Sequence, residues 1–149
     1  MQRLVVALSL VLLVGLCAAT PGQAGTPAEN PYQAEFDFTL GKPVEMRVDV
    51  GGVSLETILI TAREEVRPGA PIKCDVQFVG NNASDKKVTL TTVLLLEDAG
   101  GKGLNQGRIS LEAFKVKGGR TFDEKQVVTI AGDTLSQAVK VYVLVEVVL

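Results

Sequence analysis

The residue types that usually carry enzymatic chemistry are sparse in this chain. It contains no histidine, which removes the commonest general base, the commonest metal ligand and every serine–histidine or cysteine–histidine nucleophile pair. It also has no glycine-rich phosphate-binding loop and no CxxC motif. We therefore expect a protein that is not an enzyme, with no catalytic residues, no cofactor and no bound metal.

Three pairs of adjacent acidic residues are the remaining candidates for chemistry: Glu64-Glu65, Glu97-Asp98 and Asp123-Glu124. A calcium ion needs several oxygen ligands at about 2.3–2.6 Å, so one pair alone is too few. A calcium site would therefore need two of the pairs, Glu97-Asp98 and Asp123-Glu124, to meet at one end of the fold. Acidic residues in turns more often bond the nearby backbone. A small carboxylate- or metal-dependent hydrolase is kept as an alternative function.

The central part of the chain contains one cysteine, Cys74. In an alternating strand it shares a face with Ile72, Val76 and Phe78, which predicts an inward position. A buried cysteine behaves as a small hydrophobic side chain. We expect a buried, free and unreactive thiol. The alternative is a reactive or intermolecular thiol, because an unpaired cysteine in an exported protein can serve either purpose.

Residues 1–24 have the pattern of a secretory signal peptide. A positively charged start is followed by the apolar run Leu4 to Leu16, and Gly22-Gln23-Ala24 is a small-x-small cleavage site. The run is shorter than the roughly 20 residues of a membrane-spanning helix. We therefore expect an exported protein, periplasmic or extracellular, with no membrane span. We do not expect a lipid anchor at Cys17, because Leu16 stands where lipidation signals have a small residue.

Apolar residues alternate with polar residues through most of the remaining chain, which predicts an all-β protein. Residues 25–34 are expected to be a flexible N-terminus, and residues 35–149 an antiparallel β-sandwich of about seven to nine strands. Gly51-Gly52 predicts a two-residue hairpin turn; this hairpin, over residues 44–59, either joins the sandwich or forms a small sheet of its own. Short strands are expected at Thr121 to Phe122 and Val127 to Ile130, and no helix is expected.

From about Arg67 to Leu149 the pattern resembles immunoglobulin-like modules of bacterial envelope proteins, of the CARDB and FxLYD kinds. The residues that carry the resemblance are the Val66-Arg67-Pro68-Gly69 entry, the strand with Cys74, the Asn81-Asn82 loop and the strand ending Leu94-Leu95-Leu96-Glu97-Asp98. Glu97 stands where the FxLYD motif has tyrosine. The resemblance implies an immunoglobulin-like sandwich with a binding or scaffold role and no catalytic residues.

The net charge of −2, without a long block of like charge, argues against nucleic acid as a partner, since such proteins need a basic surface. We expect a non-catalytic binding or structural module of the bacterial cell envelope, whose partner is another envelope protein or a second copy of itself. The candidate partner contacts are Asn81, Asn82, Asp98, Tyr142 and Leu144. Asn82 also begins a sequon, Asn82-Ala83-Ser84, which matters only if the source glycosylates exported proteins.

The last strand, Val139 to Leu149, is apolar on both faces. A strand of this kind risks aggregation if it lies exposed at an edge. The ordinary expectation is a central strand with one face in the core and the other half covered. The alternative is a self-assembling subunit, in which this strand is covered by another chain through strand addition or sheet packing.

Overall fold

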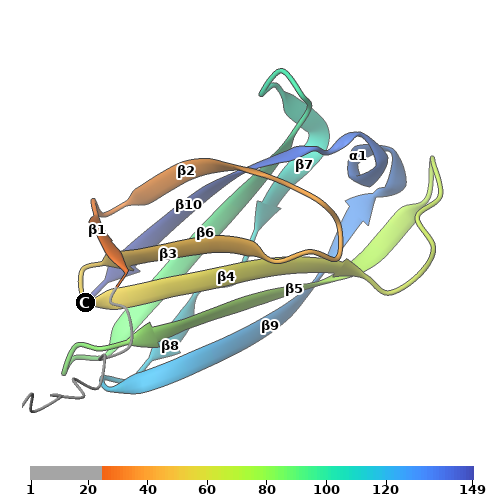
Figure 1. The fold of residues 1–149 in the computed structure, drawn as a ribbon. Helices are drawn as coiled ribbons and strands as arrows, with labels where there is room; N and C mark the ends of the chain where they lie inside the picture. Colours follow the sequence, from red (N-terminus) through yellow and green to blue (C-terminus); the bar gives the residue numbers. More distant parts are fainter. Residues whose placement is uncertain (1–24) are drawn as a thin grey trace, which may run out of the picture.

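The computed structural model describes residues 25–149, which form two packed β-sheets and one short helix (Figure 1). The expected signal peptide, its cleavage site and Cys17 lie outside the described residues. One sheet, here the β5 sheet, has the order β1 (Thr26–Ala28), β3 (Val44–Val50), β4 (Val53–Ala62), β5 (Pro71–Asn82) and β9 (Arg120–Ala131). The other, the β10 sheet, has the order β2 (Tyr32–Asp37), β10 (Lys140–Val148), β6 (Val88–Glu97) and β7 (Gly103–Ser110), and β8 (Phe114–Val116) also pairs with β6.

The ten-strand sandwich confirms the expected β-sandwich, with more strands than the sequence predicted. The predicted hairpin is also present, because β3 and β4 pair from Val50 and Val53 outward. Its turn residues Gly51 and Gly52 both have positive φ, 60° and 85°, as a two-residue turn between twisted strands requires. The hairpin is not a sheet of its own, since β4 pairs with β5 along most of its length.

The last strand, β10, is central, as the ordinary expectation held. It pairs antiparallel with β2 on one side and with β6 on the other. Both of its edges are therefore occupied within the chain. Another chain therefore cannot add a strand beside β10, and that part of the self-assembly alternative is wrong.

The segment 25–34, expected to be flexible, contributes to both sheets. β1 pairs parallel with β3, and β2 pairs with β10. The side chain of Asn30 also bonds the backbone of Val147 twice, donating to its carbonyl (2.7 Å) and accepting from its N–H (3.0 Å). The apolar alternation Tyr32, Ala34, Phe36 already begins in this segment, and it supplies the inward face of β2.

Two further elements differ from the sequence expectation. The short strands expected near Thr121 and Val127 are parts of one strand, β9, of 12 residues. A short helix, α1 (Gly132–Gln137), follows it directly. Only glycine fits at Gly132, because a Cβ there would lie 2.0 Å from the carbonyl oxygen of Arg67.

The core lies between the inward faces of the two sheets, and period-two alternation places residues there from nearly every strand. Near β8, the ring of Phe78 packs edge-on against the rings of Phe114 (6.0 Å between centroids) and Phe122 (5.5 Å). Edge-to-face packing is a favoured arrangement for aromatic pairs. No helix within residues 25–149 is long and apolar enough to cross a membrane.

Candidate protein-interaction surface

Four apolar side chains form a block on the solvent-facing side of the β10 sheet. Tyr142 and Leu144 of β10 alternate with fully buried valines, so their side chains point away from the core. On the neighbouring strand β6, Leu95 lies opposite Tyr142, and Val93 lies opposite Leu144. All four are half-buried in the isolated chain. We call Val93, Leu95, Tyr142 and Leu144 the outer patch.

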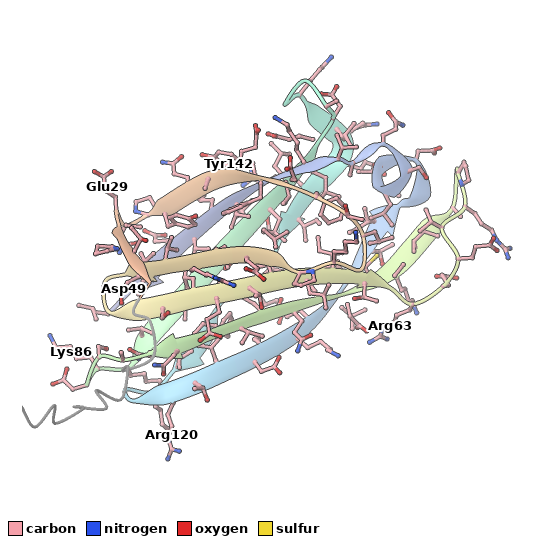
Figure 2. All side chains as sticks on the ribbon, viewed as in Figure 1. Glu29, Asp49, Arg63, Lys86, Arg120 and Tyr142 are labelled. Carbon is pink, nitrogen blue, oxygen red and sulfur yellow. The ribbon has the colours of Figure 1, made fainter. Side chains whose placement is uncertain are left out.

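Polar residues border the outer patch on both sides. On β2, Glu35 lies opposite Tyr142 and Gln33 lies opposite Leu144. The Tyr142 hydroxyl donates a hydrogen bond to Gln33 Oε1, and Figure 2 shows Tyr142 beside β2. On β7, Arg108 lies opposite Leu95 and Ser110 lies opposite Val93. An apolar centre with a polar rim is the usual composition of a protein–protein interface.

The outer face of the β5 sheet has no comparable block. Its larger outward apolar residues have polar cross-strand neighbours: Leu59 lies opposite Gln77, and Val127 lies opposite Asp75. Val79 likewise lies between threonine and aspartate on its two neighbouring strands. On that face the one adjoining apolar pair on paired strands is small, Pro71 opposite Ala131, so of the two outer faces only that of the β10 sheet has a block of four large apolar side chains.

A charged cluster lies at the end of the β10 sheet near α1. Lys140 forms an ion pair with Glu35, which lowers the pKa of the Glu35 carboxyl and raises that of the Lys140 ammonium. Glu97 lies opposite Lys140 on β6 and is 6% exposed. Burial raises the pKa of the Glu97 carboxyl, and the neighbouring Glu35 carboxylate raises it further. Its Oε2 has no hydrogen-bond partner among the described residues, so a charged Glu97 would be poorly stabilised.

The candidate contacts named from the sequence lie in different places. Tyr142 and Leu144 belong to the outer patch. Asp98 lies in the β6–β7 turn, where its carboxylate accepts the N–H groups of Gly100 (2.9 Å) and Lys102 (3.0 Å). This is the backbone-bonding role that acidic residues often have in turns. The structure therefore brings together two of the candidates and separates Asp98 from them.

Asn82 does not fit a contact role, because its side chain is fully buried at the end of β5. Its Nδ2 donates to the carbonyl oxygens of Lys86 (2.7 Å) and Val116 (3.2 Å). The same nitrogen would carry a glycan, so the folded chain does not offer it for that modification. Asn81 is half-buried, and like Asn82 it belongs to β5 rather than to the loop expected there.

The two carboxylate pairs Glu97-Asp98 and Asp123-Glu124 do not meet. Asp123 and Glu124 lie opposite Val79 and Phe78, in the half of β9 near β8, whereas Glu97 ends β6 at the α1 end of the other sheet. No group of three or more potential acidic or cysteine ligands is present within residues 25–149. The hydrolase alternative therefore has no site built from these two pairs.

Cys74 lies where the alternation places it, on the core side of β5. Its side chain is fully buried and has no disulfide partner within the described part of the chain. Burial raises the pKa of the Cys74 thiol, and the negative charges of Asp75 and Glu64 raise it further. A higher pKa leaves less of the nucleophilic thiolate at neutral pH.

Sequence reasoning did not identify Val93 and Leu95 as candidate surface residues. They belong to the run VLLL, in which every residue is apolar, so the run alone does not show which members face outward. The polar Thr89 and Thr91, on the same alternate positions, were the available signal for the outward face. Both threonines do face outward in the structure, with Thr89 half-buried and Thr91 exposed.

Comparison with known proteins found no matching family model, no matching curated protein and no matching solved structure. The part of the CARDB and FxLYD resemblance that is supported is the two-sheet β-sandwich.

Proposed function

We propose that this protein is an exported, non-catalytic binding or structural module of the bacterial cell envelope, which contacts another protein through the outer patch. One observation carries the proposal: the two outer faces differ, and only that of the β10 sheet has four large apolar side chains in two adjoining cross-strand pairs. Contiguous apolar surface with a polar rim is typical of protein interaction sites.

We also infer that the sandwich is of the immunoglobulin-like kind. Two packed sheets of mainly antiparallel strands support this inference, together with crossovers that carry the chain from one sheet to the other, as between β5 and β6. In such modules the sheets form a rigid support, so a contact face on β6 and β10 would be presented without the ordering cost of a flexible loop.

The interaction is tested with a photo-cross-linking amino acid at Leu144, in cells of the organism that makes the protein. The matched control carries the same amino acid at Gln77, on the outer face of the other sheet. We expect a defined adduct from position 144, which mass spectrometry identifies and which an added Tyr142→Lys change in the same chain weakens. Equal adducts from both positions, or an adduct insensitive to Tyr142→Lys, would contradict the proposed surface.

Export is tested separately, by fractionation of the same cells and by determination of the first residue of the protein. The signal peptide pattern leads us to expect a periplasmic or extracellular protein that begins near Gly25. A cytoplasmic protein that retains residues 1–24 would contradict export and leave the cross-linking result to stand alone.

A further inference from the structure

The outer edge of β9 is open. β9 is the last strand of the β5 sheet and pairs only with β5, without a register shift over its 12 residues. The Gly132 N–H donates to the carbonyl of Ala70 (2.8 Å), in register with this ladder. Even-numbered residues of β9 therefore bond to β5, and odd-numbered residues direct their N–H and C=O groups away from it. No strand within residues 25–149 pairs with those groups.

The two halves of this edge differ in charge. The half nearer β8 carries Asp123, Glu124 and Lys125, and charged residues at an edge discourage pairing with another strand. The half from Val127 to Ala131 has no charge and consists mainly of β-branched residues, which favour strand pairing. Val127 is 52% exposed. Only the second half therefore has both open backbone groups and side chains suited to a partner strand.

A groove lies alongside the last residues of this edge, from Thr129 to the start of α1. Two adjoining hollows, with volumes of about 290 and 310 Å³, share Gln106, Ala131 and Asp133 in their linings. Asp133 is exposed at the start of α1, and its carboxylate accepts the N–H of Gly69 (2.9 Å). A strand that paired with Val127–Ala131 and ran on past the end of β9 would enter this groove.

We propose that a second copy of this chain docks on the Val127–Ala131 edge, antiparallel, about a two-fold axis at Thr129. In this register Thr129 faces Thr129 of the second copy, and Val127 faces Ala131 of the second copy. These are odd-numbered residues, so each pair has the free N–H and C=O groups needed to exchange two backbone hydrogen bonds. The contact is isologous: the same segment contributes from both copies.

Self-complementarity singles out a second copy as the partner. On the outer side of the sheet, the Thr129 hydroxyls of the two copies face each other. The larger apolar side chain of Val127 faces the smaller one of Ala131 of the second copy. On the inner side it sets Val128 against Ile130 of the second copy, a pair of β-branched residues of the kind that stabilises paired strands. Continuing the register brings Lys125 opposite the start of the second copy's α1, where Asp133 lies in the groove. Because the contact is symmetric, a Lys125 ammonium lies near an Asp133 carboxylate of the other copy at each end of the paired segment.

The dimer is tested by cysteine cross-linking, using the protein obtained by expressing the full chain. Thr129→Cys places the new thiols face to face at the axis, where paired residues have Cα atoms about 5.5 Å apart, within the range that disulfides span. Thr121→Cys, also exposed and outward on β9, is the matched control. Cys74 is buried and does not compete. We expect Thr129→Cys to form a linked dimer at least about tenfold faster than Thr121→Cys under mild oxidation. Equal rates would overturn the proposal.

A second measurement is independent of cysteine chemistry. Thr129→Lys sets two like charges against each other at the axis, and Thr121→Lys is its control. Sedimentation should show a concentration-dependent dimer for the native chain and for Thr121→Lys, but only monomer for Thr129→Lys, with unchanged circular dichroism. A native chain that stays monomeric up to about 1 mM would overturn the proposal. This outcome leaves the proposed function intact, because the outer patch lies on the other sheet.

Discussion

Replacing Asn82 with alanine should destabilise the fold strongly, although Asn82 is a polar residue at a strand end. Besides its two donated bonds to Lys86 and Val116, its Oδ1 accepts the N–H (3.1 Å) and the hydroxyl (2.7 Å) of Ser84. Because β8, which contains Val116, pairs with β6, this one side chain joins the end of β5 to the other sheet. It also orders the loop between β5 and β6.

The size of the effect follows from these four contacts. Alanine would leave the carbonyl of Val116 without this donor at a buried position, and an unsatisfied buried group costs about 1–3 kcal/mol. The one bond to Lys86 and the two to Ser84 lie nearer solvent, where water partly replaces the amide, so each of the three contributes roughly 0.5–1 kcal/mol. The sum is about 2.5–6 kcal/mol. With a urea m-value of about 1.5–2 kcal/mol/M, the unfolding midpoint should fall by about 1–4 M.

The assay is equilibrium unfolding in urea, followed by far-ultraviolet circular dichroism, for the native chain, Asn82→Ala and the control Asn81→Ala. The side chain of Asn81 makes no hydrogen bond within the described residues, and its half-buried position faces the opposite side of β5. We expect Asn81→Ala to change the unfolding free energy by less than about 0.5 kcal/mol. If the two variants unfold within about 0.3 M of each other, the reasoning is refuted.

Three further predictions concern other buried groups. Because the pKa of Glu97 is raised in the fold, the unfolding free energy should fall as the pH rises from the ordinary carboxyl value of 4.5 through the raised pKa. Glu97→Gln should lose this part of the pH dependence in urea titrations that begin below the ordinary value, and parallel curves for the two proteins would contradict the prediction. Gly132→Ala should lower the melting temperature by about 8 °C or more, because the added Cβ would clash with the Arg67 carbonyl. An unchanged melting temperature would contradict this prediction and show that the loop containing Arg67 moves aside. A thiol reagent should modify Cys74 only after unfolding, and rapid labelling of the native protein would contradict its burial.

The parts of the fold that could be predicted from sequence follow from short-range rules. Alternation places Cys74 and Phe78 inward and Tyr142 and Leu144 outward, because successive side chains of a strand point to opposite faces. Gly51-Gly52 marks a hairpin, because few other residue pairs tolerate the positive φ that the turn requires. Half of the outer patch could be found in this way.

The rest depends on contacts between residues far apart in the chain. Asn82 resembles a loop residue in sequence, and only the position of Val116 on the other sheet shows why it is buried. Pairing of β1 with β3 and of β2 with β10 likewise joins the expected flexible N-terminus to distant strands. Helix α1 has too few residues to show an apolar period. The other half of the outer patch, Val93 and Leu95, follows only from the pairing of β6 with β10.

The central claim is that a partner covers the outer patch in the cell envelope. It is tested most directly by carbene footprinting of the protein in intact cells and after purification, with the labelling of individual side chains read by mass spectrometry. We predict that Val93, Leu95, Tyr142 and Leu144 are labelled less in cells than in the purified protein, whereas Leu59 and Val79 on the other sheet are labelled equally in both. Equal labelling of the outer patch in the two samples would contradict the claim.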